Sequence, residues 1–217
     1  MNPLDRRMER VHGRSMEDIL AELVSHAADL LEAPQKYIIE GSVTGAHLRA
    51  LPGLPFEVPI FEHKGKLILA TGTEETVSED IMTKRGLIGS KLSFHAHANI
   101  NGVVFDAPSF DDLRIALERG QRRGLMPPIL AHRDGLVIYS INQRQFDAIT
   151  HKMSAWREAN RKALYASDIE QHIETIKLQA AAEREFAERA HAIVFECTWD
   201  DKRGVERILD MFHAATD

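Results

Sequence analysis

The chain lacks most features that mark secreted, membrane-embedded or nucleic-acid-binding proteins. Its 217 residues include one cysteine, Cys197, which excludes an intramolecular disulfide framework and a cysteine-based zinc site. The formal net charge of −6 argues against a nucleic-acid partner, because phosphate binding needs a basic surface. No stretch approaches the roughly 18 apolar residues of a membrane span, and the N-terminus has no apolar signal segment. We therefore expect a cytoplasmic protein with neither a membrane nor a nucleic-acid partner.

The first two thirds of the chain alternate between helical and strand patterns. Ser15, with Asp18 three residues later, predicts the start of a helix that ends before Pro34. The polar residues before Ser15 predict a frayed tail. Further along, the pattern predicts strands over 36–45, 65–73 and 91–99, irregular chain over 52–59, a short helix within 74–86, a helix starting at Pro108-Ser109, and a hairpin over 129–141 around Asp134-Gly135.

The last third has a different character. Residues 143–192 contain no proline or glycine and are rich in alanine and charged residues, which predicts one or two long helices. A short strand is expected over 191–199 and a last helix over 205–215. We expect three parts, a tail over 1–14, a catalytic domain over 15–142 and a helical extension over 143–217. The fold class is α/β, a mixed, largely antiparallel sheet flanked by helices. The extension is a candidate surface for a homo-oligomer or a partner protein.

The segment from Ser93 to Leu113 carries the strongest chemical signal. In a strand, residues two apart share a face, so His95 and His97 point the same way with Cα atoms about 6.5 Å apart. Two imidazole nitrogens at this spacing can bind one zinc ion, which needs a third protein ligand and an open position for water. Asp112 is the best-placed third ligand, with Asp111 and Asp106 as alternatives.

Each part of this pattern also has an ordinary structural explanation. A lone H-x-H pair in a strand is more often a pair of surface or core histidines than a metal site. Ser109 and Asp112 have the spacing of a capping box at a helix start, which needs no chemistry. The combination of both motifs in sequence favours the metal site.

The order of these motifs resembles the MPN/JAMM metalloprotease domain. H-x-H is followed by S-x-x-D at a helix start and then a strand pair, and Glu40 in IIEGSVTG matches the family's upstream glutamate. The resemblance covers residues 15–141 and implies a cytidine-deaminase-like α/β architecture. It also implies that His95, His97 and Asp112 bind Zn²⁺, that Glu40 is the general base, and that Ser109 donates a hydrogen bond to the oxyanion.

The resemblance implies zinc-dependent hydrolysis of a peptide or isopeptide bond, with a ubiquitin-like or other protein as substrate. Glu57 and Glu62 are alternatives to Glu40 as the general base. Two other functions stay open at this stage. One is a metal-dependent phosphoesterase of the polymerase-and-histidinol-phosphatase type, which also uses H-x-H. The other is a non-catalytic scaffold of the MPN type.

Overall fold

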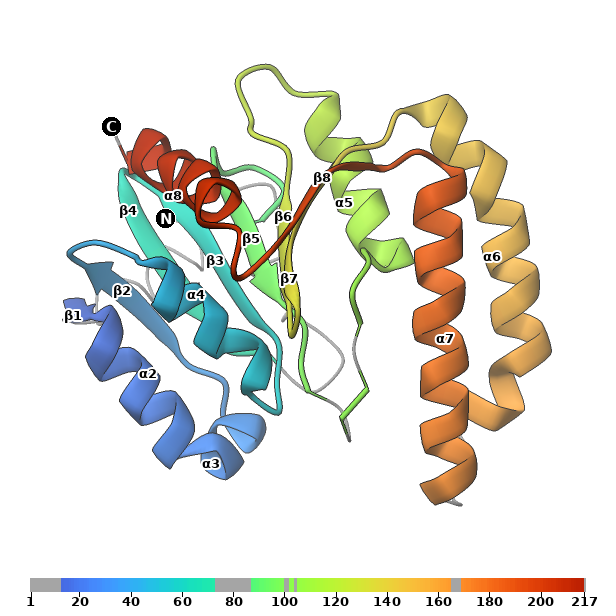
Figure 1. The fold of residues 1–217 in the computed structure, drawn as a ribbon, viewed down its shortest axis with the longest axis horizontal. Coiled ribbons are helices and arrows are strands. Elements are labelled where there is room, and N and C mark those ends of the chain that lie inside the picture. Colours follow the sequence, from blue (N-terminus) through green and yellow to red (C-terminus); the bar gives the residue numbers. More distant parts are fainter. Residues whose placement is uncertain (1–12, 73–86, 100–101, 104, 165–168, 217) are drawn as a thin grey trace.

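The computed structural model describes residues 13–72, 87–99, 102–103, 105–164 and 169–216. Within them the chain forms an α/β fold in which one mixed sheet is flanked by helices, as the sequence predicts (Figure 1). The helix expected within 74–86 lies outside the described residues, as do residues 1–12 of the predicted tail. Residues 13 and 14 belong to a strand. No described helix has the length and apolar character that crossing a membrane requires.

The described sheet has eight strands in the order β1-β2-β4-β3-β5-β6-β7-β8. Only the β1/β2 and β5/β6 pairs are parallel, so the sheet is largely antiparallel. The strands are β1 (Gly13–Ser15), β2 (Lys36–Glu40), β3 (Val58–His63), β4 (Lys66–Ala70), β5 (Ser93–Ala96), β6 (Ile129–His132), β7 (Gly135–Tyr139) and β8 (Ile193–Thr198).

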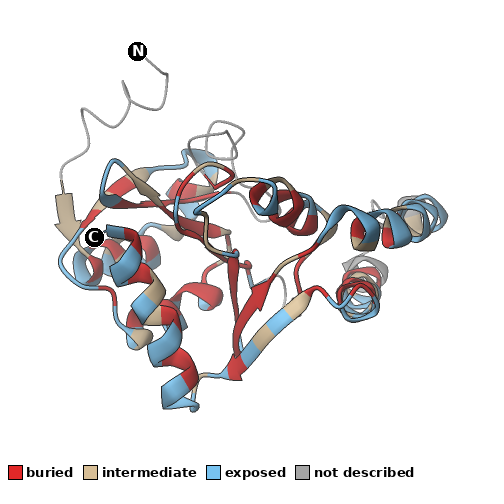
Figure 2. Cartoon of the chain, turned by 90° about the horizontal axis from the view of Figure 1, so that it is seen from above, coloured by how far each residue is buried: buried red, intermediate tan, exposed pale blue. Residues whose placement is uncertain are grey.

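Helices cover both faces of the sheet, and Figure 1 shows them in two groups. The helices are α2 (Met16–Ser25), α3 (Ala27–Glu32), α4 (Gly45–Ala50), α5 (Phe110–Gly120), α6 (Gln143–Leu164), α7 (Ile169–Arg189) and α8 (Lys202–Thr216), with a 3-10 turn at Leu51–Gly53. One apolar core lies under α2, α4 and α8, and a second lies under α5, α6 and α7. Figure 2 shows buried residues along the central strands and on the inner sides of these helices.

Strand alternation assigns residues of the central strands to one core or the other. Phe94 and Ala96 of β5 belong to the α2/α4/α8 core, where Phe94 contacts Phe212 edge to face at 5.4 Å. His95 between them must point to the opposite face, beneath α5, α6 and α7. There its ring lies edge-on to Tyr139 at 6.4 Å. The alternation of β5 therefore places the first motif histidine in the layer that contains α5.

Several predicted elements differ from the structure at their ends. The first helix is interrupted at His26, which separates α2 from α3. The strand predicted over 36–45 ends at Glu40, because Gly41 takes a positive φ of 83° and turns the chain toward α4. The irregular stretch predicted over 52–59 is wrong at its end, since β3 begins at Val58. Pro59 is tolerated there because it precedes Ile60, the first β3 residue paired with β4.

The last third of the chain contains two long helices, a strand and a final helix, in the order the sequence predicts. β8 pairs with β7 along the same sheet, and α8 packs on the core formed with α2 and α4. Gly135 allows this close approach, because a Cβ there would overlap the carbonyl of Cys197. The sequence division at residue 142 therefore does not coincide with a break in the sheet.

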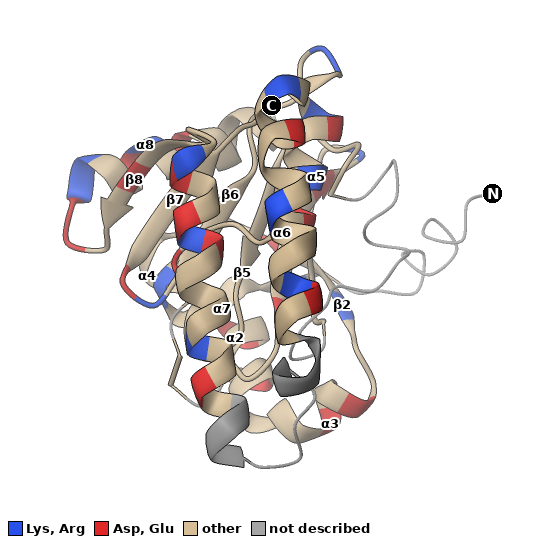
Figure 3. Ribbon diagram, turned by 90° about the vertical axis from the view of Figure 1, so that its right-hand side faces the viewer, with Lys and Arg blue, Asp and Glu red and all other residues tan. Residues whose placement is uncertain are grey.

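Helices α6 and α7 form an antiparallel pair beside the sheet (Figure 1). Basic and acidic residues are interspersed along the described parts of both helices (Figure 3). Their inward sides pack on α5 and on the connection that follows β5. The α6/α7 pair therefore covers part of the layer into which His95 points.

Candidate metal centre

The H-x-H histidines lie side by side at the end of β5. His95 is within the strand and His97 follows its last residue, and their ring centroids are 5.0 Å apart. Both side chains are buried, with 4% and 8% exposure. The two-residue spacing places both rings on the same face of the sheet, as the sequence predicts.

The third residue, Asp112, lies in the first turn of α5. Ser109 is the N-cap of this helix, and its Oγ accepts a hydrogen bond from the Asp112 amide at 3.2 Å. Asp112 Oδ2 accepts the Ser109 amide at 2.8 Å, which completes the predicted capping box. This box turns the carboxylate back across the helix start toward β5. The capping function and the ligand position of Asp112 are thus two results of one local structure.

The three side chains converge on one point. His95 Nε2 lies 3.1 Å from Asp112 Oδ1, and His97 Nε2 lies 3.2 Å from Asp112 Oδ2. One ligand atom from each residue lies within 4.8 Å of the other two, and all three residues are buried. His95 Nε2 has no hydrogen-bond partner of acceptable geometry. A metal ion at this point would bind the buried nitrogen of His95 together with the carboxylate and the second imidazole.

The tautomer of His97 also fits metal binding. Its Nδ1 lies 3.1 Å from the carbonyl oxygen of Phe105, and a carbonyl can only accept, so Nδ1 carries the proton. In the neutral ring this leaves a lone pair on Nε2, the atom that faces Asp112. Metal-binding histidines usually donate their other ring nitrogen to such a carbonyl.

The pKa values of the cluster show how strongly its members interact. Burial would raise the pKa of Asp112, but the two adjacent imidazoles hold it well below its ordinary value. Burial would lower the pKa of His97, but its hydrogen bond to Asp112 raises it. The carboxylate is therefore ionised at neutral pH, which is the form that binds a cation.

Glu40, the glutamate matched to the family pattern, is not brought to this cluster. It is exposed at the end of β2, beside Ser15 of β1. Strands β4 and β3 lie between β2 and β5, a span of roughly 14 Å at the usual strand spacing. The register also places Glu40 at the end of the sheet where β5 begins, whereas His97 follows the end of β5. Glu62 lies at the same distant end, where it accepts the Gly65 amide.

Glu57 is the glutamate that the sheet places near the histidines. It directly precedes β3, whose Val58 pairs with Ala96, so Glu57 and His97 are at the same end of neighbouring strands. Burial of its carboxyl group raises its pKa to about 8, with His97 lowering it and Asp112 raising it. The register of β3 and β5 therefore makes Glu57 a better candidate for the general base than Glu40 or Glu62.

The alternative aspartates have other partners. Asp111 is exposed and lies 3.5 Å from Arg114 of the same helix. Asp106 lies in the connection between β5 and α5, where its carboxylate is 3.9 Å from Arg184. Asp112 alone of the three joins the histidines in the described cluster.

The structure adds residues from α7 that the sequence does not suggest. Glu183 is 4% exposed, and burial raises its pKa to about 7, with smaller influences from His97 and Asp112. Its neighbour Arg184 contacts the β5–α5 connection. Some 70 residues separate α5 from this part of α7, and no local pattern indicates that the two helices meet near one site.

A pocket lies next to His97. It is lined by His97 itself and by Pro52, Asn99, Val103, Phe105, His132 and Arg133. The buried candidate ligand His97 therefore borders this pocket. Comparison with models of known protein families, with curated proteins and with solved structures finds no match for this chain.

Proposed function

We propose that this protein is a metal-dependent hydrolase with His95, His97 and Asp112 as its metal ligands. The observation that carries the proposal is the convergence of their three ligand atoms within 4.8 Å, in a buried site where His95 Nε2 lies 3.1 Å from Asp112 Oδ1 without the geometry of a hydrogen bond. Histidines are common in cores, but an isolated core histidine would normally satisfy both ring nitrogens.

Zinc is the metal that best suits these ligands. Two imidazoles and one carboxylate form a common ligand set of catalytic zinc sites, in which three protein ligands leave the fourth position open. A zinc ion held there would supply Lewis-acid activation of the attacking water and of the substrate carbonyl at neutral pH.

The surrounding residues have roles that follow from their positions. A cation held at the site would lower the pKa of Glu57 from about 8 and ionise its carboxyl group at neutral pH. The ionised Glu57 would then take the proton of the attacking water as the water oxygen bonds to the carbonyl carbon. When the carbon–nitrogen bond breaks, Glu57 would pass that proton to the leaving amine. Ser109 Oγ accepts from the Asp112 amide, so its own hydroxyl hydrogen is free to donate to the developing oxyanion. Glu57 thus takes the role first assigned to Glu40.

The substrate class rests on the resemblance to the MPN/JAMM domain, which the motif order supports. On that basis we propose that the bond cleaved is a peptide or isopeptide bond in a protein substrate, such as one joined to a ubiquitin-like modifier.

The metal content of the purified protein tests the proposal directly. We expect close to one equivalent of zinc in the wild type, and its loss in His97→Ala and Asp112→Asn. His151→Ala is the matched control, because His151 is exposed on α6. Equal zinc in all four proteins, or none in the wild type after zinc addition, would contradict the ligand assignment.

A substrate panel then separates the possible activities. Linear peptides, isopeptide-linked conjugates and a phosphate monoester would be assayed before and after removal of metal by a chelator, and again after zinc is restored. Zinc-dependent cleavage of an amide bond supports the proposal. Cleavage of the phosphate ester alone would favour a phosphoesterase, and metal binding without any turnover would favour a scaffold.

A further inference from the structure

The connection between β5 and α5 carries an important contact of the metal centre but has little regular structure of its own. His97 donates from Nδ1 to the carbonyl of Phe105 in this connection. In its described part, the residues around Phe105 belong to neither a helix nor a strand. What holds this carbonyl in place must therefore come from other parts of the fold.

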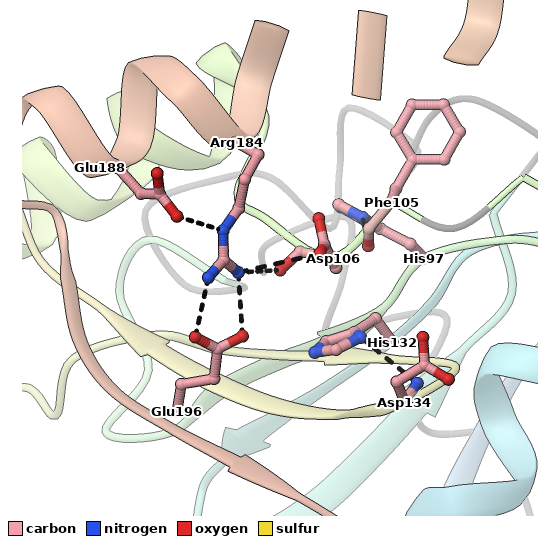
Figure 4. A network of polar contacts seen from close by, with 8 residues as sticks. All are labelled: His97, Phe105, Asp106, His132, Asp134, Arg184, Glu188 and Glu196. Atoms are coloured by element: carbon pink, nitrogen blue, oxygen red, sulfur yellow. Dashed lines mark hydrogen bonds and ion pairs between the residues drawn. The ribbon is translucent and has the colours of Figure 1, made fainter. Parts of the chain in front are cut away.

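Arg184 of α7 supplies one anchor. Its Nη1 donates to the Asp106 carbonyl at 3.3 Å, one residue beyond Phe105. The same guanidinium forms a two-pronged contact with Glu196 of β8, with both distances 2.9 Å. Its Nε donates to Glu188 of its own helix at 2.7 Å. Figure 4 shows this guanidinium between the helix, β8 and the connection that leads to His97.

Apolar packing from the same helix supplies a second anchor. Val103 is buried against Ile176 and Ala180, and Phe105 packs at the edge of this cluster. Ile176, Ala180 and Arg184 are spaced four residues apart, so they follow one side of α7. The helix thus contacts the connection at Val103, at Phe105 and at Asp106.

We propose that Arg184 is a positioning residue of the metal centre. By fixing the Asp106 carbonyl, it holds the adjacent Phe105 carbonyl within hydrogen-bond distance of His97 Nδ1, and so keeps the His97 ring oriented with Nε2 toward the metal position. This inference rests on the proposed function. Under this inference, α7 contributes to the metal centre a residue that belongs to neither the H-x-H nor the S-x-x-D motif.

The contacts that Arg184 makes are strong for physical reasons. An arginine–carboxylate pair with two parallel contacts is strong and geometrically specific. Arg184 is only about a quarter exposed, so water competes weakly for its donors. Hydrogen-bond partners of metal ligands typically change metal affinity by about 10- to 100-fold when removed. Arg184 acts one step further away, so we expect an effect at the lower end of that range.

Metal affinity of Arg184→Gln tests the proposal. Zinc would be titrated against a chromophoric chelator in metal-free wild type and variant. We expect a dissociation constant about 10-fold higher in the variant. Arg189→Gln is the matched control, since Arg189 is on the same helix and pairs with Glu185 one turn away. It should bind zinc like the wild type.

Two further measurements distinguish a loss of positioning from a folding defect. Arg184→Lys retains the charge but cannot form the two-pronged contact with Glu196, so it should weaken zinc binding even if Arg184→Gln unfolds. Proton–nitrogen NMR of the His97 ring in metal-free protein should show an Nδ1 proton that is hydrogen-bonded and protected from exchange with water in the wild type and in Arg189→Gln. In the Arg184 variants this Nδ1 proton should exchange faster with water.

The outcomes separate this inference from the proposed function. Unchanged zinc affinity and unchanged protection of the His97 Nδ1 proton in folded Arg184→Lys would overturn the positioning role while leaving the metal site intact. A wild type that binds no zinc would contradict the proposed function, and the NMR comparison would still decide whether Arg184 fixes the His97 ring.

Discussion

His97 Nε2 lies 3.2 Å from Asp112 Oδ2, and that same oxygen accepts the backbone amide of Ser109 at 2.8 Å. One carboxylate therefore closes the N-terminus of α5 and faces the histidine cluster. The helix start aids both functions, because its unpaired amides favour negative charge at this position. A change at Ser109 would then affect two properties at once, the stability of the helix and the chemistry of the site.

Substitutions at Ser109 can separate these two properties. Glycine is almost as good an N-cap as serine but lacks a hydroxyl, so Ser109→Gly should cost only a few tenths of a kcal/mol in stability. If the hydroxyl donates to the oxyanion, turnover should fall about 100- to 1,000-fold. Thermal unfolding and steady-state rates on the cleaved substrate would measure the two effects.

Ser109→Thr is the control for this pair of effects, since threonine keeps both the cap and the hydroxyl. It should retain most activity. Ser109→Ala should lose about 1 kcal/mol of stability in addition to turnover. A fully active Ser109→Gly would remove the serine from the mechanism and leave it as a helix cap.

The identity of the general base is open to a paired test. Glu57→Gln should retain zinc and fold, because the buried carboxyl becomes a neutral amide of the same shape. Its turnover should fall by about 100- to 10,000-fold, the usual contribution of a general base. Glu40→Gln should leave turnover unchanged, because Glu40 is exposed at the far end of the sheet. The reverse pattern would restore the assignment that the family motif suggests.

The comparison of these two glutamates shows which part of the site could be predicted from sequence. His95, His97, Ser109 and Asp112 lie within 18 residues, and strand alternation and a capping box are local rules that position them. The base depends on which strand pairs with β5, and that register is not a local property. Pro59 also makes β3 hard to predict, because a proline suggests irregular chain and here it lies where a central strand begins.

The same argument explains the C-terminal third. Its helical composition predicted α6 and α7 well, because uninterrupted alanine-rich and charged sequence favours helices. The contact of Arg184 with Asp106 joins residues 78 positions apart and depends on how the helix pair packs against the sheet. The presence of an arginine in the sequence does not indicate that Asp106 is its partner.

Arg119 offers a test of the fold that does not involve the site. It is 2% exposed, and its guanidinium donates to the carbonyls of Leu87, Ser90, Lys91 and Met126. These contacts fasten the chain just before β5 to α5. Burial lowers the pKa of Arg119 to about 10, which leaves it charged at neutral pH.

Arg119→Met should therefore lower the free energy of unfolding by at least about 3 kcal/mol, because it leaves several buried carbonyls without donors. Arg114→Met on the same helix is the control. Arg114 is about half exposed and contacts only Asp111 and Glu118 of α5, so the loss should be about 0.5 kcal/mol or less. Urea unfolding at pH 7 would measure both. Equal losses would show that the carbonyl contacts of Arg119 contribute little.

Glu183 predicts how the metal-free protein responds to pH. Burial raises its pKa from 4.5 to about 7, so the folded state holds a proton that the unfolded state has released between these values. Stability from this group is full below pH 4.5 and is lost as pH rises to about 7, with a total of up to roughly 3 kcal/mol. Glu57, with its pKa raised to about 8, acts in the same direction.

Glu183→Gln should flatten this part of the profile. With a chelator present, the variant should be more stable than the wild type at pH 8, and the difference should shrink as the pH falls toward 5. Glu185→Gln, which changes an exposed carboxylate on the same helix, should follow the wild type throughout. Urea unfolding at several pH values would provide the comparison. A Glu183→Gln profile parallel to that of the wild type would mean that Glu183 is solvated in the folded protein, contrary to its 4% exposure.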